Sequence, residues 1–219
     1  MFDNFYFFHI DKTIGRLMGI HMMDPLYPIM EDHGIKSKQL NIDHEAHNYW
    51  QNFEKNTYIY ATFRDPVERF VSDFVYTVNY EINGYRKWSP GNGDRDKFSP
   101  FMNLNYFKDW MNNSAIFNYQ SRVLSSNTLD NDIIKERISK INLFIKTESL
   151  ENNEKNIQEK ILKDLNINYK LSDFNRDYEI TFYEEMTKNF INDFLDNSLL
   201  INEVRNRNSI DFEIYSSIN

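Results

Sequence analysis

The stretch from residue 58 to residue 76 constrains the fold of this chain more than any other part of the sequence. Its first part, Tyr58 to Phe63, is an aromatic and β-branched run that is typical of a buried strand. The run ends at Arg64, and Asp65 and Pro66 follow as a good helix N-cap and a good first helical residue. Apolar residues then recur at the spacing of a helix with one buried face. The stretch therefore predicts a buried strand that passes directly into an amphipathic helix.

Arg64 is expected at the carboxyl end of that strand, beside the N-terminus of the helix. Open α/β sheets bind anionic ligands at such positions, because the N–H groups and the dipole of the helix favour negative charge. Ser72 lies further along the helix, close to the same face. The residues alone also allow a plainer interpretation, in which Arg64 pairs with a neighbouring carboxylate and Ser72 is a solvated helix residue.

The amino-terminal segment has the layout of a phosphate cradle. Phe5 to Ile10 is apolar nearly throughout and predicts a central strand of a parallel sheet. A turn that contains Lys12 and a short helix over 17–23 follow, so that helix N–H groups and a lysine can face an anion. An ordinary nucleoside-triphosphatase loop does not fit, because Tyr6 and Asp11 stand where that loop needs glycines. A plain surface turn with a lysine is the alternative.

The fold class follows from the alternation of strands and helices along the chain. The other expected elements are strands over 38–42 and 141–146, and helices over 107–124, 130–140, 153–165 and 183–195. A chain of 219 residues is long enough for one full hydrophobic core. We therefore expect a single α/β domain over 1–219, with a mostly parallel central sheet flanked by helices.

Residues from about 79 to 105 differ in character from the rest of the chain. They contain glycines, prolines, aromatic residues and basic residues, and they predict a long irregular insert. Aromatic rings suit sugar faces and basic side chains suit an anionic group, so the insert is a candidate acceptor-binding loop. A partly disordered insert is equally compatible with this composition.

The composition excludes several classes of function. The formal net charge of −8 disfavours a nucleic-acid binder, which is usually basic. The absence of cysteine excludes a thiolate metal site, a disulfide framework and a cysteine nucleophile. There is no apolar run of about 18 residues and no leader with a basic start and a cleavage site, so we expect no membrane span and no signal peptide. The expected location is the cytoplasm of a microbe or virus, as a soluble protein.

Two histidines, His44 and His47, follow the strand that is expected over 38–42. Their spacing would suit a metal pair, but no third ligand is in view, so we predict no metal site. A histidine has a pKa near neutrality and can take a proton from a hydroxyl group. A histidine on a helix surface or at a helix cap is the plainer alternative for each of them.

The sequence RDPVERFVSDFVY, which starts at Arg64, resembles the 3′-phosphate-binding segment of sulfotransferases that use 3′-phosphoadenosine 5′-phosphosulfate. The resemblance is nearest to the carbohydrate sulfotransferases of the heparan sulfate 2-O and 6-O type, in which this segment has the pattern R-[DK]-P-x-x-R-[FL]-x-S-x-[YF]. It implies a P-loop-like sulfotransferase fold, and it implies that Arg64 and Ser72 hold the 3′-phosphate. The resemblance extends over about 5–217 and is strong over 58–76.

The sequence FHIDKTIGRLM resembles the 5′-phosphosulfate loop of the same family, which commonly has the pattern H-[IV]-P-K-T-G-G-T-S. The matching residues are Lys12, Thr13 and Gly15. The departures from the pattern are Asp11, Ile14, Arg16 and Leu17. The resemblance implies that Lys12, Thr13 and Gly15 bind the donor. Arg16 is expected to join them, because it offers several hydrogen-bond donors in place of the missing hydroxyl groups.

Two further segments match the family by position. The 2-O type enzymes have a catalytic histidine in a G-H-x-x-x-x-x-F pattern between the two donor-binding segments, and this implies that His47 is the base, with His44 in reserve. The sequence from Phe117 to Leu124 resembles an N-x-Q-[TS]-R-x-L segment that follows the acceptor region. That match makes Asn118, Gln120 and Arg122 candidates for substrate contact.

The resemblance implies an enzyme that moves a sulfuryl group from 3′-phosphoadenosine 5′-phosphosulfate to an acceptor hydroxyl group, expected on a carbohydrate, without a metal. In this interpretation His47 removes the acceptor proton and Lys12 stabilises charge on the leaving phosphate oxygen. A nucleotide-dependent kinase-like enzyme and a non-catalytic relative that binds a nucleotide or glycan are the alternatives.

Overall fold

The computed structural model describes residues 2–9, 23–41, 50, 54–83, 102–150, 153–171 and 184–218. These residues belong to two compact units, each built from segments that are distant in the chain. The first unit comprises 1–65, 118–173 and 210–219, and the second comprises 66–117 and 174–209. The expectation of a single domain over 1–219 stays a prediction.

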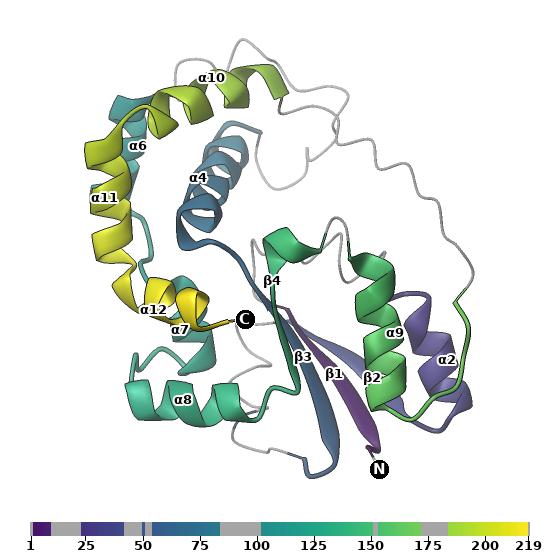
Figure 1. Ribbon diagram of the computed structural model, residues 1–219. Coiled ribbons are helices and arrows are strands. Elements are labelled where there is room, and N and C mark those ends of the chain that lie inside the picture. Colours follow the sequence, from purple (N-terminus) through teal and green to yellow (C-terminus); the bar gives the residue numbers. More distant parts are fainter. Residues whose placement is uncertain are drawn as a thin grey trace. The chain divides into compact units, whose positions relative to one another are not determined.

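The first unit is built on a parallel sheet of four strands in the order β2-β1-β3-β4. The strands are β1 (Asn4–His9), β2 (Lys36–Asn41), β3 (Thr57–Phe63) and β4 (Leu143–Lys146). Each neighbouring pair is parallel, with Phe8 opposite Ala61 and Phe63 opposite Lys146. The predicted parallel sheet is confirmed, and the two aromatic runs, β1 and β3, lie side by side at its centre (Figure 1).

Helices cover both faces of this sheet (Figure 1). The helices of the first unit are α2 (Leu26–Asp32), α7 (Tyr119–Leu124), α8 (Asn131–Ser139), α9 (Glu154–Asp164) and α12 (Ser209–Ser217), with a 3-10 turn over Thr147–Ser149. Apolar residues of α2 and α9 pack with Phe5, Phe7 and Tyr60 on one face. Residues of α7, α8 and α12 pack on the other face, with Phe8 and Ala61. The α/β class with flanking helices is therefore confirmed.

The alternation of side chains along β3 explains why its sequence is apolar throughout. All seven residues of β3 are buried, because successive side chains point to opposite faces and both faces are covered. Tyr58 and Tyr60 belong to the core on one face, whereas Ile59, Ala61 and Phe63 belong to the core on the other.

The regular elements described in the second unit are all helices. Its helices are α4 (Pro66–Asn83), α6 (Leu104–Asn113), α10 (Glu184–Leu195) and α11 (Ser198–Arg207). An aromatic core joins α4, α6 and α10, in which Phe74 contacts the rings of Phe107, Trp110 and Phe190 at centroid distances of 5.0–5.4 Å. The apolar spacing after Pro66 thus corresponds to one buried face of α4.

Most expected elements lie within two residues of the observed ones, and two differ by more. The irregular insert was expected from about 79, but residues 79–83 are helical because α4 continues to Asn83; residues 84–101 lie outside the described part. The single helix expected over 107–124 is two helices, α6 and α7, because the chain leaves the helical conformation after Asn113 and Asn118 has a positive φ of 51°. No helix among the described residues is long and apolar enough to cross a membrane.

A buried tyrosine ties β3 to α9. The hydroxyl group of Tyr58 donates a hydrogen bond of 2.8 Å to the carboxylate of Asp164, and Lys160 Nζ lies 2.9 Å from the same oxygen. Burial acts to raise the pKa of Asp164, but the hydrogen bonds from Lys160 and Tyr58 outweigh it and hold the pKa below its usual value of 3.8. The ionised carboxylate therefore stabilises the folded state.

We expect Tyr58→Phe to lower the free energy of unfolding by about 1.5 kcal/mol at pH 7, since it removes one hydrogen bond to a carboxylate. Because the pKa of Asp164 is lower in the folded chain, its contribution is fully present above pH 3.8 and is lost as the pH falls through the folded-state value. Urea denaturation from pH 7 down to pH 3 should show the difference between wild type and variant becoming smaller. Tyr169→Phe, at a half-exposed tyrosine, is the control and should change little at any pH. A difference that stayed constant down to pH 3 would contradict this account.

Candidate functional site

The strand order places a topological switch point between β1 and β3. The chain passes from β1 to β2 on one side of β1, and from β3 to β4 on the opposite side of β3. Connections that diverge in this way leave a crevice outside the carboxyl ends of the two strands, where open α/β sheets bind their ligands. The carboxyl ends of β1 and β3 are His9 and Phe63. This edge of the first unit is therefore the candidate site.

Arg64 lies directly at this edge. It is the residue that follows the last residue of β3, its side chain is half-buried, and α4 begins two residues later at Pro66. The predicted order of a strand, Arg64 and a helix that begins at Pro66 is thus confirmed. A guanidinium group at the carboxyl end of a central strand suits a phosphate group, because it is permanently charged and can donate two parallel hydrogen bonds.

The side-chain amide of Gln120 forms hydrogen bonds with both backbone polar groups of Arg64. The Oε1 atom of Gln120 accepts a hydrogen bond of 2.9 Å from the Arg64 N–H, and its Nε2 atom donates one of 2.9 Å to the Arg64 carbonyl oxygen. The Gln120 side chain is fully buried. The amide of Gln120 therefore continues the hydrogen bonding of β3 by one residue beyond the end of the strand.

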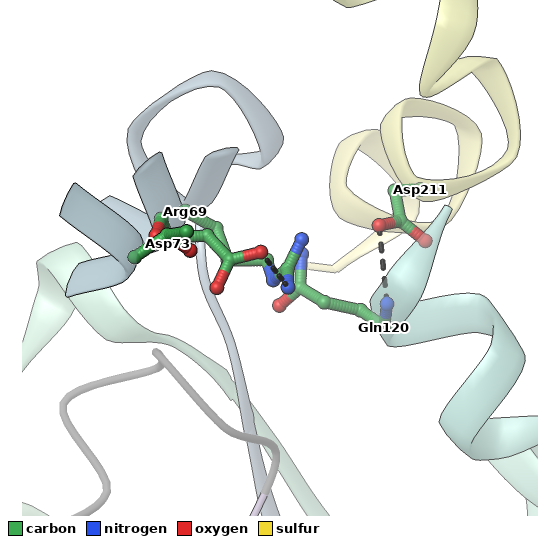
Figure 2. A network of polar contacts seen from close by, with 5 residues as sticks. Arg69, Asp73, Gln120 and Asp211 are labelled. Carbon is green, nitrogen blue, oxygen red and sulfur yellow. Dashed lines mark hydrogen bonds and ion pairs between the residues drawn. The ribbon is translucent and has the colours of Figure 1, made fainter. Parts of the chain in front are cut away.

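Reciprocal caps between α7 and α12 hold Gln120 itself. Asp211 on α12 accepts hydrogen bonds from the backbone N–H groups of Gln120, at 3.2 Å, and Ser121, at 2.7 Å, and also from the Ser121 hydroxyl group. Figure 2 shows the carboxylate of Asp211 directed at the Gln120 backbone. In return, Asn118 Oδ1 accepts from the N–H groups of Ile210 and Asp211 at 3.0 and 3.2 Å. Each helix start thus supplies the side chain that caps the other.

The side chain of Glu148 binds the next backbone N–H group along the chain, which is that of Asp65. Its carboxylate accepts hydrogen bonds from the Asp65 N–H at 2.8 Å and from the Tyr215 hydroxyl group at 3.1 Å. The ammonium group of Lys146 lies 4.8 Å from the centre of the Tyr215 ring. Side chains already bind the N–H groups of Arg64 and Asp65, so of these three groups it is the guanidinium group of Arg64 that suits an anion.

Thr147 supplies a buried hydroxyl group at the same edge of the sheet. It follows the last residue of β4, it is 1% exposed, and its Oγ1 atom has no hydrogen-bond partner among the described residues. A buried hydroxyl group without a partner is costly unless a ligand or another group binds it. Because Thr147 is 1% exposed, the group of this edge that suits a phosphate-bearing ligand is the guanidinium group of Arg64.

The second unit carries Ser72, which lies on α4 with a half-buried side chain. That Ser72 and Arg64 bind one phosphate stays a prediction. The same helix carries Arg69, which is 2% exposed and forms an ion pair of 3.3 Å with Asp73, drawn in Figure 2. The sequence analysis did not single out this pair, although the i,i+4 spacing of Arg69 and Asp73 was a usable signal.

Several predicted site residues lie outside the described part of the chain. They are Lys12, Thr13, Gly15 and Arg16, which follow β1 in the sequence, and His44 and His47, which follow β2. Their roles stay predictions. Of the three candidates for substrate contact, Asn118 and Gln120 bind backbone groups as described above, and Arg122 is half-buried on α7.

The structure also contains polar residues that the sequence analysis did not propose for the site. They are Glu148, Asp211 and Thr147. Asp211 and Glu148 bind backbone N–H groups that are distant in sequence, and no local pattern indicates such pairs. The lone hydroxyl group of Thr147 could have been suspected only from its place directly after a predicted strand.

Comparisons of the chain with protein families, with curated proteins and with solved structures find no match in any of the three.

We expect Asn118→Gly and Asn118→Ala to destabilise the fold to different degrees. Both variants remove the cap on α12, which costs about 1 kcal/mol. Alanine adds a further cost of about 1 kcal/mol, because residue 118 has a positive φ that glycine adopts without strain. Chemical denaturation should give the order of stability wild type, Asn118→Gly, Asn118→Ala. Equal stability of the two variants would contradict the left-handed conformation at this residue.

Proposed function

We propose that this protein is a sulfotransferase that uses 3′-phosphoadenosine 5′-phosphosulfate as donor and has the P-loop-like fold of that family. The observation that carries the proposal is the position of Arg64 at the switch point of a parallel sheet, directly before a helix that begins with proline. This position supports the role that the sequence resemblance implies for Arg64, which is to bind the 3′-phosphate.

The chemistry of the site edge supports the same ligand class. The edge offers the guanidinium group of Arg64, which suits the phosphate oxygens of a nucleotide. The chain also continues from β1 into the segment that contains Lys12, at the strand next to β3. Two phosphate-binding segments on neighbouring central strands suit a nucleotide that carries phosphates on both its 3′ and 5′ positions.

The donor supplies an activated sulfuryl group, and the acceptor is a hydroxyl group, which we propose is on a carbohydrate. His47 takes the proton of the acceptor hydroxyl group. Lys12 stabilises the negative charge that develops on the phosphate oxygen as the sulfuryl group leaves. Thr13, Gly15 and Arg16 hold the same phosphate. Arg64 and Ser72 hold the 3′-phosphate and so orient the donor towards the acceptor.

A non-catalytic nucleotide-binding relative is the second candidate. A specific observation favours it, namely the presence of Asp11 and Ile14 in the loop around Lys12, where the family has proline and glycine. Such a relative would keep Arg64 for binding and would lack turnover.

The first test of the function is thermal stabilisation by 3′,5′-adenosine bisphosphate, which is the expected product. A ligand at 100 times its dissociation constant adds about 2.7 kcal/mol to the free energy of unfolding, which corresponds to a rise in Tm of roughly 5–10 °C for a chain of this size. We expect this rise in the wild type without Mg²⁺. In Arg64→Ala the affinity should fall about ten- to a hundredfold, because a charged hydrogen-bonding partner of the phosphate is lost.

The controls separate the candidate functions. Arg205→Ala, at an exposed arginine of α11, should keep the wild-type affinity for the bisphosphate. Stabilisation only by ATP with Mg²⁺ would favour a kinase-like enzyme instead. No stabilisation by any of these nucleotides would contradict the proposed donor class.

We expect His47→Ala to lower turnover roughly 10²–10⁴-fold, which is the usual contribution of a general base. Its affinity for 3′,5′-adenosine bisphosphate should stay at the wild-type value, because the histidine acts on the acceptor and not on the donor. The measurement is the rate of sulfate transfer to a panel of hydroxyl acceptors. His33→Ala is a matched control, since His33 binds the Ile29 carbonyl oxygen at the end of α2. Normal turnover in His47→Ala would show that another group is the base.

A further inference from the structure

We propose that Gln120 is a positioning residue for Arg64, and that it sets the preference of the protein for nucleotides that carry a 3′-phosphate. The inference rests on the proposed function, since it assigns to Arg64 the binding of that phosphate. It differs from the role expected from the sequence, which was direct contact between Gln120 and the substrate.

The hydrogen bonds of Gln120 argue against direct contact with a ligand. Its Oε1 and Nε2 atoms bind the Arg64 N–H and carbonyl groups at 2.9 Å each, and the side chain is 0% exposed. A neutral carboxamide that makes two such bonds and has no exposed surface cannot approach a substrate. Any effect of Gln120 on binding therefore has to pass through Arg64.

The same two bonds fix the direction of the Arg64 side chain. The N–H group of a residue belongs to the peptide plane before it, and its carbonyl group belongs to the plane after it. When hydrogen bonds fix both groups, both planes are fixed, and they determine the direction of the Cα–Cβ bond. Arg64 follows the last residue of β3, so the strand itself does not hold it. A guanidinium group that forms two parallel bonds to a phosphate needs this control, because a small error at Cα becomes larger at the end of a long side chain.

The support behind Gln120 is itself rigid. Asp211, which is 1% exposed, binds the N–H groups of Gln120 and Ser121 and fixes the start of α7. Leu124, on the same short helix, is fully buried in the core against the sheet. The path from the core through α7 to the backbone of Arg64 thus contains only buried groups.

The test is a cycle of variants with two probes, 3′,5′-adenosine bisphosphate and adenosine 5′-monophosphate, titrated by calorimetry on the full chain. The ratio of their dissociation constants measures the contribution of the 3′-phosphate alone. We expect Gln120→Met to reduce this ratio about tenfold, which is the scale of one lost charged hydrogen bond, and to leave the affinity for the monophosphate nearly unchanged. In the Arg64→Met background, Gln120→Met should change the ratio no further.

A matched control separates positioning from stability. Tyr58→Phe removes one hydrogen bond from β3 at its amino end, and it should lower stability without changing the ratio. If Gln120→Met does not fold, the same measurements are made on Gln120→Glu. The carboxylate of this variant can still accept the hydrogen bond from the Arg64 N–H, but it cannot donate one to the Arg64 carbonyl oxygen. The new negative charge of Gln120→Glu can itself change the ratio of the dissociation constants. That effect is measured in the Arg64→Met background, and it is then subtracted from the effect in the wild-type background.

The outcomes distinguish the inference from the proposed function. A wild-type protein that binds both probes equally would refute the proposed function, and the inference with it. A wild-type preference for the bisphosphate that persists in the Gln120 variant would refute the inference alone. An effect of Gln120→Met on the ratio that is equally large without Arg64 would also refute it, because Gln120 would then act by another route.

Discussion

β3 is a fully buried central strand, so each of its backbone N–H and carbonyl groups needs a hydrogen-bond partner within the protein. The structure of the first unit depends on these hydrogen bonds. β1 and β4 provide the hydrogen bonds along most of its length. Near its start, Asn142 accepts from the Ile59 N–H through its side chain and donates to the Ile59 carbonyl oxygen through its backbone. At the other end, Gln120 binds the N–H and carbonyl groups of Arg64. Amide side chains thus continue the hydrogen bonding of the strand where no neighbouring strand is available.

This arrangement has a consequence for the chemistry of the site. Buried backbone groups need partners, and at most strand ends solvent provides them. At the end of β3, Gln120 and Glu148 bind the two consecutive N–H groups of Arg64 and Asp65. A ligand beside Arg64 and Asp65 would therefore be bound by side chains and not by these two backbone N–H groups, which differs from an ordinary P-loop. The identity and direction of Arg64 become correspondingly important.

Much of this architecture could be predicted from the sequence because its signals are local. The aromatic run before Arg64 and the proline after Asp65 determine a strand and a helix start within a few residues, and both are confirmed. The parallel sheet followed from the alternation of strands and helices. The break between α6 and α7 was missed, because the groups that the side chain of Asn118 caps, the N–H groups of Ile210 and Asp211, lie about ninety residues away.

The contacts within the site were less predictable for the same reason. Gln120 was singled out only through a resemblance, and its partner Arg64 is 56 residues distant. No periodicity or composition indicates that pair, or the pair of Glu148 and Asp65. Such contacts depend on the completed sheet and its covering helices, so they are properties of the fold and not of any segment.

The most direct test of the account is a crystal structure of the full chain with 3′,5′-adenosine bisphosphate. The account predicts the nucleotide at the carboxyl ends of β1 and β3, with its 3′-phosphate about 3 Å from the guanidinium nitrogens of Arg64. Gln120 should still bind the backbone of Arg64 in that structure. A nucleotide bound elsewhere, or one bound here with its 3′-phosphate directed away from Arg64, would contradict the central claim.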